Sequence, residues 1–336
     1  MDFDLLQEHL DDLGQPAYRA GQIWSWAARG VASFDEMTNL PLELRARLAG
    51  GVPFSSLSVE NEAHASDGTI KVLFRTGDGR PLEAVLMRYR DGRRSLCLSS
   101  QSGCPLTCTF CATGQMRFGR NLTVSEILDQ ALHFRRLGSV DHAVFMGMGE
   151  PMMNLDAVLD ACAKLPDLGI GNRHTAISTV GWIPGIERLT TERMPVRLAL
   201  SLHAADDALR SELMPVNDRY PLGEVLDACR AHYERKRRMV FVEYVMLAGV
   251  NDSYVQARQL AEVLDPKAFK VNLIPYNPTD SPYEGSSPKA IDAFRAELER
   301  AGVAATVRLT RGRDIAAACG QLAAGASPAQ PAPAPG

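Results

Sequence analysis

Three cysteines, Cys104, Cys108 and Cys111, lie within ten residues of one another. Their spacing, C-x3-C-x2-C, places three thiols on one short loop. Three thiolates can hold three irons of a cubane [4Fe–4S] cluster and leave the fourth iron without a protein ligand, whereas electron-transfer clusters use four cysteines. An open iron can bind a small molecule, so the spacing predicts a cluster that takes part in chemistry.

A structural zinc site is the alternative interpretation of these cysteines. Such a site needs four nitrogen or sulfur ligands in a closed tetrahedral arrangement. The first Cys or His after Cys111 is His133, more than twenty residues downstream. The missing fourth ligand favours the cluster.

Composition and charge limit the class of protein. The chain has 336 residues, a net charge of −4 and 46% hydrophobic residues, which favours a folded core and argues against a general polyanion binder. Residues 1–8 are acidic and do not resemble a signal peptide, and no run of eighteen apolar residues occurs. We therefore expect a soluble protein in a reducing cytoplasm, with no membrane partner.

Arginines flank the cysteine loop on both sides. Arg88, Arg90, Arg93 and Arg94 precede it, and Arg117 and Arg120 follow. Solvated turns and helix ends explain most such clusters, but the arrangement also suits contacts to nucleic-acid phosphates. Charge alone does not decide between the two.

The hydrophobic pattern divides the chain into four parts. The first reads as helices, the second contains a hairpin around Gly77-Asp-Gly79, and the third alternates strands with helices. The last is rich in Pro and Ala and is expected to be disordered. The predicted parts are residues 1–50, 51–94, 95–322 and 323–336.

The third part predicts an α/β fold. Strands that alternate with helices form a parallel sheet with right-handed crossovers, and six units are too few for a closed eight-stranded barrel. A short edge strand is expected at 304–309. The predicted strands are 95–100, 142–147, 174–180, 196–203, 239–246 and 270–276, and the predicted helices begin near 123, 155, 205, 222, 253 and 288.

Polar residues follow these strands where each one ends. The carboxyl ends of parallel strands meet at one rim, where such folds carry their chemistry. The cysteine loop, the segment 147–151, Ser178, residues 201–203 and Asn277 all fall at this rim.

Five segments, taken together, resemble the RlmN family of radical S-adenosylmethionine (SAM) RNA methyltransferases. They occur in the family's order, and the resemblance runs from the N-terminal helices to about residue 322. It implies a partial (β/α)6 barrel joined to an N-terminal helical RNA-binding module. The segments are 97–114, 145–154, 200–204, 271–278 and 310–322.

The resemblance implies a [4Fe–4S] cluster on Cys104, Cys108 and Cys111, and SAM as methyl donor and radical source. The implied target is C2 of an adenine, a carbon that simple displacement cannot methylate. Cys319 would carry the methyl group, and Cys97 would attack its sulfur to release the product, leaving a Cys97–Cys319 disulfide. Glu83 would accept the C2 proton.

The resemblance also implies the residues that contact SAM. Glu150 would pair with the SAM amino group, and Gly149 would let the backbone approach closely. The full implied set is Gly149, Glu150, Ser178, Ser201, Leu202, His203 and Asn277.

Structural roles compete with several of these assignments. A strand cysteine such as Cys97 is often a small core residue, and Cys319 before Gly320 could be a helix-end residue. A strand glutamate such as Glu83 ordinarily faces solvent. The turn between Glu83 and Cys97 can vary in length, so the sequence does not fix which residue pairs with Cys97. The sequence predicts packing roles for four further residues, which are Cys162, Cys229, Trp24 and Trp26.

The implied substrates are 23S rRNA and tRNA, with flavodoxin or ferredoxin as electron donor and a monomeric enzyme. One alternative is the sister activity that methylates C8 of the same rRNA adenosine with the same cysteines. A second is a non-catalytic RNA-binding or electron-transfer protein with a structural metal centre.

Overall fold

The computed structural model describes residues 1–323, and its central feature is one sheet of ten strands. The predicted tail 323–336, apart from Ala323, lies outside the described residues. The strand order is β1-β2-β3-β4-β7-β8-β9-β10-β11-β12. The bounds are β1 Leu57–His64, β2 Ile70–Thr76, β3 Pro81–Arg88, β4 Arg94–Cys97, β7 His142–Phe145, β8 Thr175–Thr179, β9 Arg197–Ser201, β10 Val240–Met246, β11 Phe269–Pro275 and β12 Ala305–Val307.

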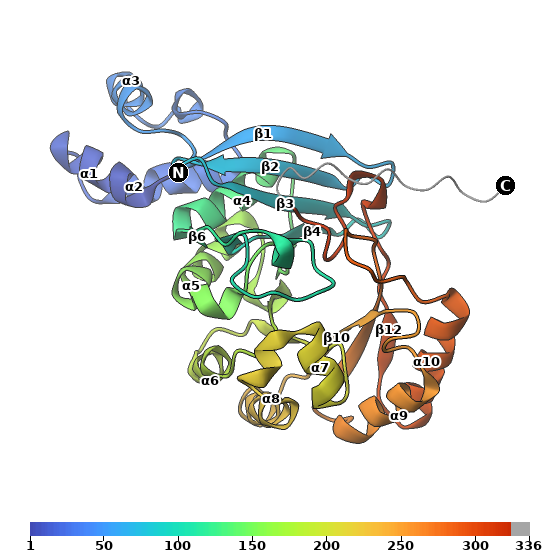
Figure 1. The fold of residues 1–336 in the computed structure, drawn as a ribbon. Helices are drawn as coiled ribbons and strands as arrows, with labels where there is room; N and C mark the ends of the chain where they lie inside the picture. The colour runs from blue at the N-terminus through green and yellow to red at the C-terminus, as the bar shows by residue number, and fades with distance from the viewer. Residues whose placement is uncertain (324–336) are drawn as a thin grey trace.

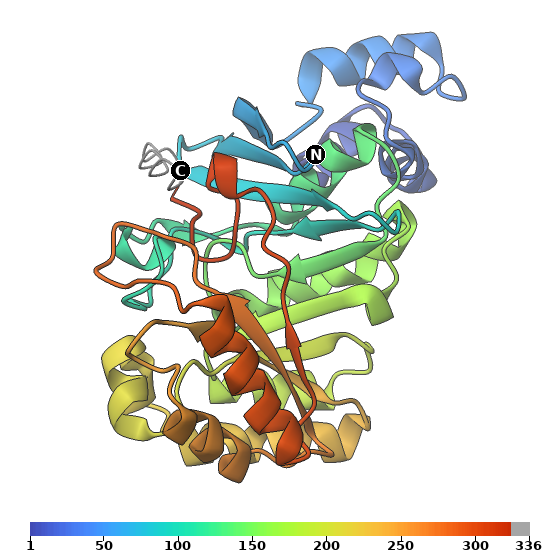
Figure 2. The same cartoon turned by 90° about the vertical axis from the view of Figure 1, so that its right-hand side faces the viewer.

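Six neighbouring strands, β4 and β7–β11, run parallel, which confirms the predicted α/β partial barrel. Helices α4–α10 follow these strands and lie outside the curved sheet (Figures 1 and 2). Parallel strands covered in this way are buried on both faces, as all five residues of β8 are. Within the described residues the two end strands, β1 and β12, do not pair, so the barrel stays open.

Ten α-helices accompany the sheet in residues 1–323, and none of them is both long and apolar enough to cross a membrane. The bounds are α1 Phe3–Asp12, α2 Tyr18–Arg29, α3 Leu42–Gly51, α4 Val124–Arg136, α5 Leu155–Lys164, α6 Ile183–Thr191, α7 Asp207–Leu213, α8 Leu222–Lys236, α9 Tyr254–Val263 and α10 Pro288–Arg300.

Strand β1 and helix α6 are the longest of the elements that escaped the sequence analysis. Most of β1 is exposed and polar, and its register shifts between Val59 and Asn61, so it lacks clean alternation. Helix α6 carries Pro184 and Gly185 in its first turn, where proline is tolerated but reads as a turn signal.

The N-terminal helices pack on the barrel through aromatic residues. Trp24 is 7% exposed, contacts Phe3 edge to face, and donates from Nε1 to Asp167 Oδ2 at 2.6 Å. Trp26 is partly buried and donates to Asn39 Oδ1 at 2.5 Å. Trp24 is therefore a core residue, as predicted. The predicted domain boundaries stay a prediction.

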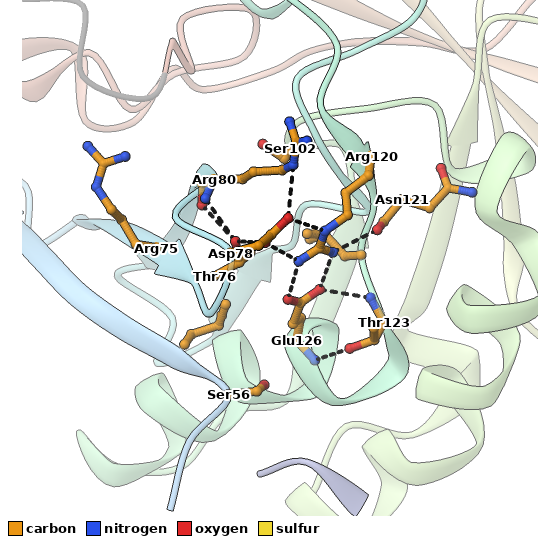
Figure 3. Close-up of polar contacts among 12 residues, drawn as sticks. Ser56, Arg75, Thr76, Asp78, Arg80, Ser102, Arg120, Asn121, Thr123 and Glu126 are labelled. Atoms are coloured by element: carbon orange, nitrogen blue, oxygen red, sulfur yellow. Dashed lines mark hydrogen bonds and ion pairs between the residues drawn. The ribbon is translucent and has the colours of Figure 1, made fainter. Parts of the chain in front are cut away.

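A charged network joins the β2–β3 turn to the end of the cysteine loop (Figure 3). Arg120 Nη2 lies 2.6 Å from Asp78 Oδ1 and 2.8 Å from Glu126 Oε1. Glu126 also completes a capping box with Thr123 at the start of α4. The guanidinium of Arg120 lowers the pKa of Asp78, so the carboxylate stays ionised. Arg120 thus holds three segments together.

We predict that Arg120→Met lowers the free energy of unfolding by about 2 kcal/mol. The Glu126 carboxylate, whose side chain is 6% exposed, loses its cationic partner in this variant. Chemical denaturation measures this loss. Arg75→Met is the control, since the Arg75–Glu60 pair is about 40% exposed on both sides and surface pairs contribute little. Equal losses in the two variants would contradict the bracing role.

Candidate active site

The cysteine loop is closed at its base by a two-stranded ribbon. Strand β5 (Gln101–Ser102) pairs with β6 (Arg120–Asn121), and the Gly119 N–H donates to Ser102 O at 2.8 Å. Gly103 has a φ of +72°, and a Cβ there would lie 2.6 Å from Arg117 O. Glycine is therefore required where the loop begins.

Two backbone hydrogen bonds attach the loop to distant parts of the chain. The Thr109 N–H donates to Leu213 O at the end of α7, at 3.0 Å, and the Ala112 N–H donates to Gly320 O at 2.8 Å. The loop therefore contacts both the barrel and the C-terminal segment that carries Cys319.

The three cysteines of the loop fit an iron–sulfur cluster. Burial raises the pKa of each thiol. The charges of Cys111 and Cys104 raise the pKa of Cys108 further, so the sulfurs lie within electrostatic reach of one another. In residues 1–323 no three Cys, His, Asp or Glu side chains converge on one point as single-ion ligands do. A cubane instead takes one thiolate on each of three irons.

A cavity of about 780 Å3, including the open space at its mouth, lies beside this loop. Among its lining residues are seven that the sequence analysis singled out. They are Cys111, Gly149, Glu150, Ser178, Ser201, His203 and Cys319.

Glu150 is a buried carboxylate held by backbone donors. Its Oε1 accepts from the Met152 N–H and its Oε2 from the Val180 N–H, each at 3.0 Å. Burial nevertheless raises its pKa to about 7. A ligand cation in the cavity would favour the ionised form.

The raised pKa of Glu150 predicts a pH dependence of stability. The folded state binds this proton more tightly than the unfolded state, so the contribution is full below pH 4.5 and is lost as the pH rises to about 7. Without SAM, the free energy of unfolding of the wild type relative to that of Glu150→Gln should fall by on the order of 3 kcal/mol across this window. Groups present in both proteins, such as His203, cancel in the difference. Glu150→Gln should lack that component. Urea unfolding from pH 4.5 to 8 measures both, and parallel profiles would contradict the assignment.

Gly149 lies where a side chain has no room. Its φ is +97°, and a Cβ would lie 2.5 Å from Gln101 Cβ. Gln101 Oε1 also accepts from the Glu150 N–H at 2.8 Å. The glycine therefore lets the Glu150 backbone pack on Gln101.

We predict that Gly149→Ala destabilises the fold by about 2 kcal/mol, from backbone strain and the clash with Gln101, and weakens SAM binding at least tenfold. Thermal unfolding and calorimetric titration with SAM measure the two effects. Gly171→Ala is the control, because a Cβ added there would meet no atom of residues 1–323 within 4 Å, and its φ is −63°. Unchanged SAM affinity in Gly149→Ala would contradict the placement.

Ser178, Ser201 and His203 lie at the ends of β8 and β9. Ser178 Oγ is 3.3 Å from Ser201 Oγ. His203 Nδ1 accepts from the Val245 N–H at 3.0 Å, and burial lowers its pKa to about 3. The imidazole is therefore neutral and carries its proton on Nε2. The unusual φ of +62° at His203 marks the bend after the strand.

Two predicted SAM contacts lie away from this cavity's lining. The side chain of Leu202 is fully buried, and its N–H donates to Glu243 O at 3.0 Å. Asn277 lines the neighbouring cavity, and its Nδ2 donates to Cys319 O at 3.2 Å. In this structure Asn277 holds the backbone of Cys319.

A second cavity contains Cys97 together with Cys319. It shares with the first cavity Met146, Ile274, Cys319 and Gly320. Both cysteines are free thiols, so the disulfide expected from the resemblance is absent here. Burial raises the pKa of Cys97 to about 12. Cys319 is exposed and lines both cavities.

Glu83 shares a sheet face with Cys97. Val85 pairs with Cys97 across β3 and β4, and Glu83 lies two residues before Val85. The residue is 3% exposed, so the expectation of a solvent-facing strand carboxylate is wrong. Its Oε1 lies 2.9 Å from Lys71 Nζ, and its Oε2 accepts from the Ala323 N–H at 2.9 Å.

Sequence reasoning missed an ion pair that lies between the two cavities. Glu243 on β10 lines the first cavity, Arg308 after β12 lines the second, and Arg308 Nη1 lies 3.2 Å from Glu243 Oε2. The available signal was Glu243 itself, a lone carboxylate in the apolar strand 240–246.

Comparison with known proteins agrees with this geometry. Residues 98–261 match the family model of the radical SAM superfamily, and residues 1–52 match that of the ribosomal RNA large subunit methyltransferase N-terminal domain. A crystal structure of a radical SAM methyltransferase from Sphaerobacter thermophilus superposes with a TM-score of 0.90 at 44% identity, covering 96% of this chain and 98% of that one. The chain is thus a radical SAM protein, a class whose cofactors are a [4Fe–4S] cluster and SAM.

Curated relatives narrow the class. A probable dual-specificity RNA methyltransferase RlmN from Heliobacterium modesticaldum is 47% identical over 92% of this chain and 84% of its own length. The dual-specificity RNA methyltransferase RlmN of Desulfotalea psychrophila is 45% identical over 95% of this chain and 92% of its own. The chain belongs to the RlmN family of dual-specificity RNA methyltransferases, as the sequence segments predicted.

Proposed function

We propose that the chain methylates C2 of adenosine in RNA, in 23S rRNA and in tRNA, with Cys319 as methyl carrier. One observation supports this most strongly: Cys319 lines both cavities. It faces the Glu150 cavity, which suits SAM, and it also faces Cys97. A residue that takes a methyl group on one side and yields its product on the other needs both contacts.

The residues of the first cavity suit SAM by their chemistry. Ionised Glu150 matches an ammonium group, the Ser178 and Ser201 hydroxyls match ribose or carboxylate oxygens, and Nε2–H of neutral His203 can donate. Cys104, Cys108 and Cys111 would hold the cluster, which supplies the reductive cleavage of SAM to a carbon radical.

The two outlying cysteines then act in sequence. The Cys319 thiolate would accept a methyl group from one SAM. The carbon radical from a second SAM would remove a hydrogen atom from that methyl, and the resulting methylene would bond to adenine C2, with the cluster taking up the electron that the adduct loses. Glu83 would take the C2 proton, which requires that Ala323 release its oxygen Oε2. Cys97 attacks Cys319 Sγ, so the S–S bond forms as the S–C bond to the product breaks.

RNA would reach the site as an unstacked base, because a stacked adenine hides its C2 edge. Exposed arginines of the cysteine loop, such as Arg117, would contact phosphates without reading sequence. The proposal includes a cytoplasmic, monomeric enzyme and an electron donor of the flavodoxin or ferredoxin class.

We predict that Cys319→Ala abolishes methylation and that Cys97→Ala accumulates a covalent RNA–protein adduct, because resolution needs the Cys97 thiolate. Methylation is measured by mass spectrometry of digested RNA, and the adduct by denaturing gel electrophoresis. Both variants should keep their iron, since neither cysteine belongs to the loop trio.

Cys162→Ala and Cys229→Ala are the matched controls, because both cysteines are buried on helices α5 and α8. They should methylate at near wild-type rates. Retained turnover in Cys319→Ala would refute the carrier role. Methyl found at C8 would replace the proposed product by that of the sister activity, and no methylation of rRNA or tRNA by the reduced holoenzyme would refute the proposed function.

A further inference from the structure

The cavity that holds Cys97 and Cys319 contains a cation without a role in the proposed reaction. Arg308 follows β12, and its side chain is 25% exposed. Its Nη1 lies 3.2 Å from Glu243 Oε2 and 3.3 Å from Met146 Sδ, and its backbone N–H donates to Leu273 O at 2.8 Å. Arg308 is therefore held at both its backbone and its guanidinium.

Glu243, which orients this guanidinium, is itself held in place. Its side chain is 3% exposed, and its Oε1 accepts from Asn272 Nδ2 at 2.8 Å. Asn272 Oδ1 in turn accepts from Thr306 Oγ1 at 2.7 Å. Residues of three adjacent strands, β10, β11 and β12, thus determine where the charge of Arg308 lies.

The charge of Arg308 acts on both cysteines. Burial, the largest influence, raises the pKa of Cys97, and Arg308 opposes it. Burial alone would lower the pKa of Arg308, but Cys319 and Glu243 together raise it. The arginine is therefore charged in the presence of either thiolate.

We propose that Arg308, oriented by Glu243, is a positioning residue that stabilises first the Cys319 thiolate and then the Cys97 thiolate. The inference rests on the proposed function for the order of the two steps. In the first, a Cys319 S–C bond forms, and the bond from the methyl to the SAM sulfur breaks with its electron pair going to that sulfur. In the second, a Cys97–Cys319 S–S bond forms, and the S–C bond breaks with its pair going to carbon, which gains a proton.

One cation can serve both steps because both nucleophiles lie in one cavity. A thiolate, not a thiol, is the reacting species in each step. Partial burial strengthens the interaction between the guanidinium and a thiolate relative to water. Glu243 holds the guanidinium of Arg308, so the charge stays in the cavity that Cys97 and Cys319 line.

Alkylation of Cys319 by iodoacetamide tests the inference in the cluster-loaded full chain, at one pH and without SAM or RNA. Peptide mass spectrometry follows the rate at Cys319. Arg308→Met and Arg308→Gln should slow it about tenfold, because the thiolate loses its cation. Arg308→Lys should restore it to within about twofold of wild type. If the Met variant does not fold, the Gln variant, which can still donate to Glu243, carries the test.

Arg311→Met is the matched control, because Arg311 lines the same cavity but pairs with Asp67 at 3.6 Å. Its alkylation rate should match wild type. Equal slowing in Arg311→Met would overturn the inference, since any cation would then suffice. Unchanged alkylation in the Arg308 variants with a raised KM for RNA would overturn it too, and would assign Arg308 to phosphate contact.

Methylation kinetics add a second readout. Arg308→Met should lower kcat with little change in KM for RNA, and Arg308→Lys should recover most of the loss. Equal loss of kcat in both variants would mean a structural role and would overturn the inference. The alkylation series needs no RNA, so its result is independent of whether the wild-type chain methylates RNA.

Discussion

The site depends on the hydrogen bonds that hold the segment around Cys319 against the cysteine loop. The Ala112 N–H donates to Gly320 O, Asn277 Nδ2 donates to Cys319 O, and Thr113 Oγ1 donates to Leu322 O at 2.6 Å. Ala112 and Thr113 directly follow the third cysteine of the loop. The position of Cys319 is therefore set relative to the cluster ligands themselves, and a displacement of one moves the other.

The β1–β2 hairpin supports the same segment through three hydrogen bonds. Asp67 Oδ2 accepts from the Gly312 N–H at 3.2 Å, Asp314 Oδ2 accepts from the Ser66 N–H at 2.8 Å, and Lys71 Nζ donates to Ala316 O at 3.2 Å. Ala316 has a φ of +50°, which costs a non-glycine residue about 1 kcal/mol. These contacts hold that conformation, so the hairpin region is part of the platform for Cys319.

The sequence predicted the elements whose signals are local. Periodic apolar residues located the six parallel strands. Because the carboxyl ends of parallel strands meet at one edge of the sheet, Glu150, Ser178 and His203 were expected to lie together, and they line one cavity. The pairing of Glu243 with Arg308 was missed because it depends on the parallel register among β10, β11 and β12. The two residues lie 65 positions apart in the sequence. Asn277 was predicted at the carboxyl end of its strand. Its contact with Cys319, 42 positions further along the chain, depends on how the intervening segment folds back to the barrel, which no local sequence pattern encodes.

Two opposing effects set the reactivity of the Cys97 thiol in the proposed reaction. Burial raises the pKa of Cys97 to about 12 even with Arg308 in the same cavity, so the resolving residue is stored as the thiol. Burial alone would also suppress the productive attack. Arg308 offsets that penalty within the same cavity, and Glu243 keeps the cation in place. Burial thus stores the resolving residue as a thiol, and the positioned charge lowers the cost of forming the thiolate that attacks.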